Sequence, residues 1–118
     1  MADQSLDRLR PLCMALPEVT EKESHGAPTW FIREKRTFAM FVDNHHNDGR
    51  IAVWAAAPPG AKEALIASDP ERFFNPPYVG TRGWVGIRLE EGVDWQEVAD
   101  LLAEGYESVA AKLGKKKA

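Results

Sequence analysis

Apolar residues recur every three to four positions at both ends of the chain, which predicts a helix at each end. The first predicted helix spans Ser5–Leu16 with Asp3 as its N-cap, and Pro11 should kink it or shift its start. The second helix should begin after Asp94, because Asp94-Trp95-Gln96-Glu97 has the pattern of a capping box. The apolar face of this second helix consists of Val98, Leu102, Tyr106, Val109 and Leu113.

Short runs of β-branched and aromatic residues lie between these helices and predict strands. Because the connections between the first four runs are short, they indicate an antiparallel meander. In the last predicted strand side chains should alternate, with Val85, Ile87 and Leu89 on one face. The predicted strands are Val19–His25, Thr29–Arg33, Thr37–Val42, Arg50–Ala56 and Trp84–Leu89.

A short helix and several turns should separate the last two of these strands. Ala61–Ser68 is predicted to be helical with Pro59 in its first turn, and Asp69-Pro70-Glu71 to start a further helical turn. Residues 73–79 are expected to be irregular or an edge strand, since their two prolines cannot donate to a ladder. Gly80-Thr81-Arg82-Gly83 is predicted to be a turn.

The order of elements predicts an α+β fold, in which an antiparallel sheet of about five to six strands carries the N- and C-terminal helices on one face. Without repeats or a linker, residues 1–114 should form a single domain, followed by a lysine-rich tail at 115–118.

Composition bounds the function that this domain can have. The formal net charge of the 118 residues is −3, which counts against strong non-specific binding of duplex DNA. Cys13 is the only cysteine, so an intramolecular disulfide is excluded and a reducing compartment fits best. No signal peptide or membrane-spanning run is evident, so the protein is expected to be cytoplasmic and not to engage a membrane.

Several short motifs occur in an order that resembles the MmcQ/YjbR family. They are Leu16-Pro17-Glu18-Val19, Ser24-His25-Gly26-Ala27-Pro28-Thr29-Trp30, Phe38-Ala39, Pro77-Tyr78-Val79-Gly80, Gly83-Trp84-Val85 and Gly105-Tyr106. The resemblance implies a twisted antiparallel sheet backed by helices, similar to the bacterial frataxin homologue CyaY. It also implies a DNA-binding-like role, although no agreed functional residues come with that description. The iron site of the frataxin-like fold is not carried over, because Arg8 and Arg10 interrupt the acidic residues of the first helix.

Aromatic and basic residues suggest a nucleic-acid-binding face. Trp84 and Arg88 should share one side of their strand, Trp54 has the corresponding phase on its own strand, and Trp30 is a further candidate. Rings beside guanidinium groups stack bases and bind phosphates. The candidates for phosphate contacts in turns are Arg33, Lys35, Arg36 and Arg82. The alternative is that the tryptophans form the core and that the charged turns are simply solvated.

Two other functions stay open. A small-ligand pocket could form among Trp30, Trp54, Tyr78 and Trp84 with His25 as its polar group, or an open sheet face could dock a protein. We found no catalytic motif, no dinucleotide- or phosphate-binding glycine loop and no metal-ligand spacing, the last including His45-His46. No enzyme activity, cofactor or metal is therefore expected, and a nucleic-acid-binding or regulatory module ranks first because of the family.

Overall fold

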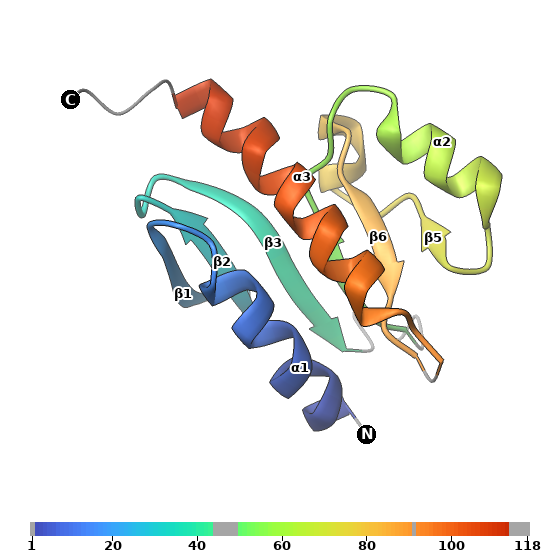
Figure 1. The fold of residues 1–118 in the computed structure, drawn as a ribbon, viewed down its shortest axis with the longest axis horizontal. Coiled ribbons are helices and arrows are strands. Elements are labelled where there is room, and N and C mark those ends of the chain that lie inside the picture. Colours follow the sequence, from blue (N-terminus) through green and yellow to red (C-terminus); the bar gives the residue numbers. More distant parts are fainter. Residues whose placement is uncertain (1, 44–49, 91, 114–118) are drawn as a thin grey trace.

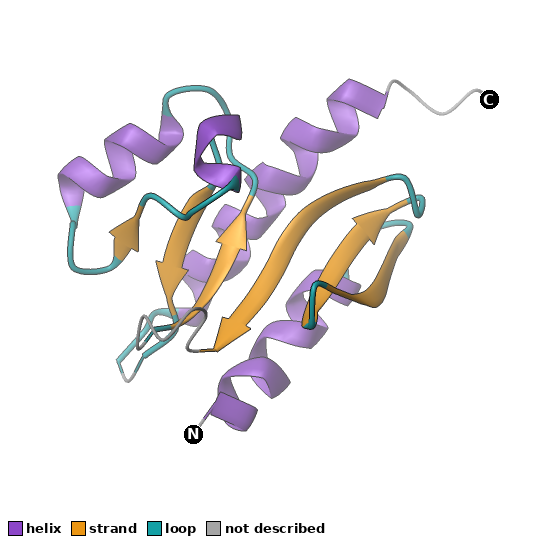
Figure 2. Ribbon diagram, turned by 180° about the vertical axis from the view of Figure 1, so that it is seen from behind, coloured by secondary structure: helices purple, strands orange, loops and turns teal. Residues whose placement is uncertain are grey.

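The computed structural model describes residues 2–43, 50–90 and 92–113. A six-stranded antiparallel sheet forms one layer, and the two long helices cross one of its faces (Figure 1). Seen from behind, the strands lie in front of these helices (Figure 2). The elements are α1 (Ala2–Met14), β1 (Val19–Ser24), β2 (Ala27–Ile32), β3 (Arg36–Asp43), β4 (Ile51–Ala55), α2 (Ala61–Ser68), β5 (Phe73–Phe74), the 3-10 helix η2 (Val79–Arg82), β6 (Val85–Arg88) and α3 (Trp95–Leu113).

The strand order is β1-β2-β3-β4-β6-β5, so the predicted α+β fold and the meander of the first four strands are confirmed. The edge strand β5 has only two residues, and Pro76 and Pro77, which cannot donate to a ladder, follow after Asn75.

Two local predictions were wrong. The first helix begins at Ala2, so Asp3 lies inside it and is not its N-cap. Pro59 lies before α2, which starts after a Gly60 N-cap with φ of 83°. The single turn predicted to start at Asp69 is present, since the Asp69 carbonyl oxygen accepts hydrogen bonds from the N–H groups of Arg72 at 3.1 Å and Phe73 at 3.0 Å. In contrast, Pro11 is accommodated within α1, whose last turn continues past it to Met14.

The start of α3 follows its predicted cap. Asp94 Oδ1 accepts hydrogen bonds from the backbone N–H groups of Gln96 at 3.0 Å and Glu97 at 3.3 Å. Farther along, Gly105 lies against the backbone of Ala56, and a Cβ at Gly105 would overlap the Ala56 carbonyl oxygen. This close approach seats α3 on the sheet. The buried residues of α3 are Val98, Leu102, Gly105, Tyr106 and Val109.

The register assigns each tryptophan of the sheet to a face. Trp30 is level with Ala39 on β3 and with Glu21 on β1, and Glu21 is ion-paired with Arg10 of α1. Trp30 therefore lies on the helix-covered face. Trp54 is level with Gly86 and with Met40, which places it on the opposite face.

That opposite face is covered largely by its own side chains. The Phe74 ring lies directly over Gly86, where a Cβ would overlap the ring. The Arg50 guanidinium in turn lies 4.0 Å from the centroid of the Phe74 ring. As a result Phe74 is only 8% exposed, and the sheet needs no further helix on this side to bury its aromatic residues.

Candidate nucleic-acid interface

The tryptophans of the predicted stacking face are buried. The exposed fractions are 0% for Trp30, 2% for Trp54 and 4% for Trp84. Trp30 also lies on the other face of the sheet, where its Nε1–H donates to Glu21 Oε1 at 3.2 Å. A base cannot stack on buried rings, and the four-residue aromatic pocket predicted around them does not form. These tryptophans belong to the core, as the alternative interpretation expected.

Two candidate residues, His25 and Arg33, lie in tight turns, and the structure of each turn explains why the residue is there. His25 is exposed, with φ of 53°, and precedes Gly26 with φ of 78°, the pattern of a type I′ hairpin turn between β1 and β2. Arg33 and Glu34 have φ of 53° and 56° in the turn between β2 and β3. The Arg33 Nε–H donates to Glu18 Oε1 at 3.0 Å, so this guanidinium is already engaged.

The segment of residues 75–83, called here the Tyr78 loop, holds an exposed aromatic ring on unusual backbone. Tyr78 is 69% exposed. Its φ and ψ of 66° and −63°, with a hydrogen bond from the Val79 N–H to the Pro77 carbonyl, define the rare and strained form of the γ-turn. For a bulky residue this conformation costs about 1–3 kcal/mol, and such strain concentrates at functional sites.

A partly buried lysine holds the Tyr78 loop in place. The side chain of Lys62, on α2, is only 13% exposed. Its Nζ donates hydrogen bonds to the Gly80 carbonyl oxygen at 2.8 Å and to Asn75 Oδ1 at 3.0 Å. A Cβ at Gly80 would overlap Asn75 Oδ1, so glycine is needed for this close packing. The loop is therefore held in one arrangement.

Arg82 is positioned by the aromatic core beneath it. Its guanidinium carbon lies 5.1 Å from the centroid of the Trp84 ring, a cation–π geometry. Arg82 itself is exposed and Trp84 is buried, so the ring supports the guanidinium at the surface. Trp84 thus acts on the site through Arg82 and not as a stacking surface.

The topology gathers most exposed candidates at one end of the sheet. β3 and β6 both run antiparallel to β4, so their first residues, Arg36 and Val85, lie at the same end (Figure 1). Lys35 and Arg36 are exposed there, on the same end as Tyr78 and Arg82. Residues 75–83 contain one arginine, Arg82, and no acidic residue, so the Tyr78 loop is locally basic.

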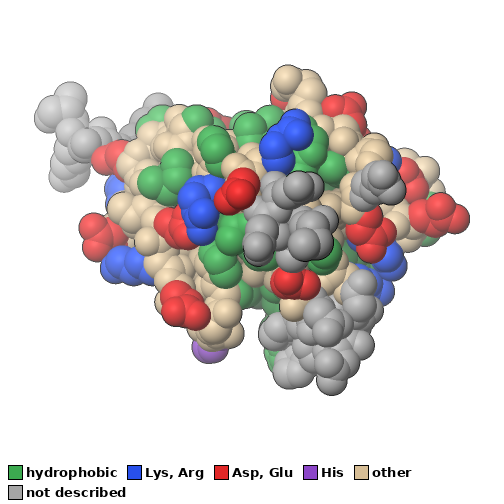
Figure 3. All heavy atoms as spheres, turned by 90° about the horizontal axis from the view of Figure 1, so that it is seen from below, with side chains coloured by type: hydrophobic (Ala, Val, Ile, Leu, Met, Phe, Trp, Pro, Cys, Tyr) green, Lys and Arg blue, Asp and Glu red, His purple; other side chains and the backbone are tan. Residues whose placement is uncertain are grey.

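Arg88 lies at the other end of β6, and so apart from Arg82. Viewed from that end, basic, acidic and apolar side chains are interspersed (Figure 3). Arg88 is itself within 3.7 Å of a Glu90 carboxylate oxygen. Among the predicted site residues, Tyr78 and Arg82 share one loop, Lys35 and Arg36 lie at the same end of the sheet but on the far side of β4, and His25 and Arg88 lie at the other end.

Cys13 on α1 and Tyr106 on α3 have clearly raised pKa values. Burial, reinforced by Glu21, raises the pKa of the Cys13 thiol well above its usual range, so the thiol stays protonated and inert. Burial also raises the pKa of Tyr106, helped by Glu18 and Glu107, while its hydroxyl donates to the Pro17 carbonyl at 2.6 Å.

Two searches of the described ranges gave negative results. No group of three or more His, Cys, Asp or Glu side chains could hold a metal ion in residues 2–43, 50–90 and 92–113. His45 and His46 lie outside those ranges. Within the same part of the chain, no helix combines the length and the apolarity needed to span a bilayer.

Sequence reasoning missed Lys62 and Asn75, whose contacts position the loop. Lys62 lies in an ordinary helical segment, and no local pattern links it to a carbonyl 18 residues away. Only Gly80 gave a signal in the sequence. It lies in a turn that begins and ends with glycine, which indicates that another group packs closely against the backbone there.

Comparison with known proteins agrees with the fold. The chain is similar to the crystal structure of Deinococcus radiodurans protein DR2400, with its family-model domain DUF419, at a TM-score of 0.77 and 21% identity. The similarity covers 94% of this chain and 82% of that chain, and at this identity it shows the fold alone. No curated protein matches. Residues 14–108, the greater part of the chain, match the YjbR family model. The chain therefore belongs to the YjbR family.

Proposed function

We propose that this chain is a nucleic-acid-binding module that contacts single strands through the Tyr78 loop. The observation that carries the proposal is the 69% exposed Tyr78 ring, held on strained backbone four residues from Arg82. Backbone strain of this kind costs about 1–3 kcal/mol and clusters at functional sites. It is the kind of feature that selection maintains for binding.

Stacking and charge would act together at this loop. A base that stacks on an exposed aromatic ring contributes about 1–3 kcal/mol, and the interaction tolerates any sequence because every base has a π-face. The Arg82 guanidinium, supported by Trp84, could donate paired hydrogen bonds to a phosphate. Since Lys62 already fixes the loop, little conformational entropy would be lost on binding.

Single strands fit this surface better than duplex. Duplex binders neutralise many phosphates, whereas this chain has a net charge of −3 and several of its basic residues are ion-paired. Stacking on Tyr78 also requires a base that is already unstacked from its neighbours. Lys35 and Arg36, at the same end of the sheet, could extend the contact along a backbone.

The test is fluorescence anisotropy of labelled single-stranded and duplex oligonucleotides at low and moderate salt. Wild type should bind the single strand, weakly and with steep salt dependence, and the duplex less well. Arg82→Gln should reduce the salt slope by about 0.7, the contribution of one phosphate contact to a single strand. Lys112→Gln removes the same charge from α3 and should leave binding unchanged. Absence of single-strand binding at low salt would overturn the proposal.

A further inference from the structure

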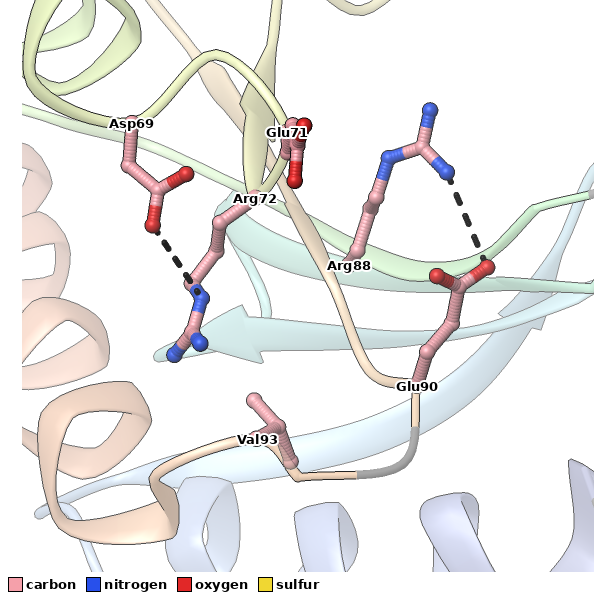
Figure 4. A pocket seen from close by; sticks show the side chains of 6 residues that line it. All are labelled: Asp69, Glu71, Arg72, Arg88, Glu90 and Val93. Atoms are coloured by element: carbon pink, nitrogen blue, oxygen red, sulfur yellow. Dashed lines mark ion pairs between the residues drawn. The ribbon is translucent and has the colours of Figure 1, made fainter.

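A charged hollow of about 180 Å³ lies at the opposite end of β6 from the Tyr78 loop. It is bounded by the turn before β5, the end of β6 and the segment that leads into α3 (Figure 4). Its lining residues are Asp69, Glu71, Arg72, Arg88, Glu90 and Val93. At about 30 Å³ per water molecule, it has room for roughly six waters, which is the scale of one free amino acid.

The two arginines of the hollow differ in how they are engaged. Arg72 Nη1 donates to Glu97 Oε1 at 3.3 Å, and Arg72 Nε lies 3.8 Å from Asp69 Oδ2. Arg72 is therefore held between two carboxylates and serves the fold. In Figure 4 its guanidinium turns toward Asp69 and away from Arg88.

Arg88 has hydrogen-bonding capacity that the described residues do not use. Its Nε is buried and has no hydrogen-bond partner in the described part of the chain. Its Nη1 lies 3.7 Å from Glu90 Oε2, which is too long for a hydrogen bond. An unmade hydrogen bond at a buried donor costs about 1–3 kcal/mol, and such a donor calls for a water or a ligand.

The charges around Arg88 select the kind of ligand. Asp69 and Glu97 together carry one negative charge more than Arg72, and the other charged residues that line the hollow are Arg88, Glu71 and Glu90. A simple anion would face both glutamates, and a simple cation would face Arg88. A small molecule that carries a carboxylate and an ammonium group meets an opposite charge with each.

We propose that this hollow binds a free α-amino acid. Its carboxylate would accept hydrogen bonds from Arg88, and its ammonium group would donate to Glu71 and Glu90. Val93 provides an apolar wall, which favours a short aliphatic side chain over a charged one. The site is independent of the nucleic-acid surface, since Arg88 and Arg82 stand at opposite ends of β6.

NMR titration of the full chain tests this proposal, with the Arg88 Nε–H resonance as the readout. L-Alanine should shift that resonance with saturation below about 10 mM, in the range of weak specific ligands. N-acetyl-L-alanine lacks the ammonium group and L-alaninamide lacks the carboxylate, so each should bind at least about tenfold more weakly. An unmoved resonance, or equal responses to all three compounds, would overturn the proposal.

Because Arg88→Gln, which removes the proposed carboxylate partner, can fail to fold, a second variant tests the ammonium side of the site. Glu71 is exposed, so Glu71→Gln should fold normally and weaken L-alanine binding at least about fivefold through loss of one ammonium partner. Glu63→Gln removes the same charge from α2, away from the hollow, and should not affect the binding. Equal binding by wild type and Glu71→Gln would contradict the assigned ligand geometry.

Discussion

Lys62 Nζ donates a 2.8 Å hydrogen bond to the Gly80 carbonyl oxygen and so joins α2 to the Tyr78 loop. Lys62→Met keeps the aliphatic stem and removes this donor. We expect it to lower the free energy of unfolding by about 1–3 kcal/mol, since hydrogen bonds from charged groups contribute about that much. It should also weaken single-strand binding, because the loop is no longer held in place. Urea unfolding and oligonucleotide anisotropy measure the two effects.

Lys112→Met is the matched control for this prediction, because it removes the same charge from an exposed position on α3. Its free energy of unfolding should stay within about 0.5 kcal/mol of wild type, as is usual for surface changes. If both lysine variants weaken oligonucleotide binding equally, Lys62 acts through its charge alone and not by positioning the loop.

Because the backbone at Tyr78 is strained, we expect glycine at this position to give a more stable protein than alanine, the reverse of the usual order. Tyr78→Ala and Tyr78→Gly both remove the ring, but only glycine adopts φ of 66° without a Cβ penalty. We expect Tyr78→Gly to be more stable than Tyr78→Ala by about 1 kcal/mol, measured by urea unfolding. Both variants should lose stacking with single strands. A more stable alanine variant would mean that the backbone at this position carries no strain.

Gly105 should be intolerant of even a methyl group. In an isolated helix Gly→Ala stabilises by about 1 kcal/mol, but here the added Cβ would overlap the Ala56 carbonyl oxygen. Because backbone must move to make room, we expect Gly105→Ala to lower the free energy of unfolding by about 2–3 kcal/mol. Thermal or urea unfolding measures this loss.

The reverse exchange on the exposed side of α3 serves as the control. Ala111→Gly should cost about 1 kcal/mol, so that both directions of the Ala/Gly exchange destabilise the same helix. A gain in stability from Gly105→Ala would show that α3 does not approach β4 as closely as described.

The buried Cys13 thiol makes stability fall at alkaline pH. Its folded-state pKa is raised by burial, so the folded protein keeps the proton while the unfolded chain loses it above about pH 8.5. The stabilising contribution is complete below that pH and is lost as the pH rises. Between pH 7.5 and 10 the free energy of unfolding, measured in urea, should fall by roughly 2 kcal/mol more for wild type than for Cys13→Ala.

The same comparison separates Cys13 from Tyr106, whose pKa is also raised by burial. Tyr106 is present in both proteins, so its contribution, which begins near pH 10, cancels in the difference. Parallel pH profiles for wild type and Cys13→Ala would show that the thiol is solvated in the folded protein.

Periodicity was enough to predict the layers of the fold. The apolar face of α3 and the Asp94 cap depend on residues three or four apart, and such local patterns survive folding. Alternation in β6 likewise placed Val85 and Ile87 opposite Trp84 and Arg88, and the cross-strand register agrees. Two element boundaries were predicted wrongly. Asp3 is a typical N-cap residue but lies inside α1, and Pro59 is a typical first-turn residue but lies before α2.

The accessibility of the site could not be predicted from the sequence. Alternation says which residues share a face, but not whether that face is covered, so Trp54 and Trp84 seemed available although both are buried. Trp30 lies on the helix-covered face, at the start of a register shift to Phe31 that period-two counting cannot detect. The positive φ of Tyr78 could not be predicted from the sequence either, because tyrosine is not a residue that favours positive φ.

The most direct test of the central claim compares wild type with Tyr78→Ala in anisotropy titrations of a labelled single strand at low salt. The account predicts that wild type binds and that loss of the ring weakens binding by about 1–3 kcal/mol, or roughly five- to 150-fold. Equal binding by the two proteins would contradict the claim that the Tyr78 loop is the nucleic-acid surface, and no binding by either would contradict the proposed function itself.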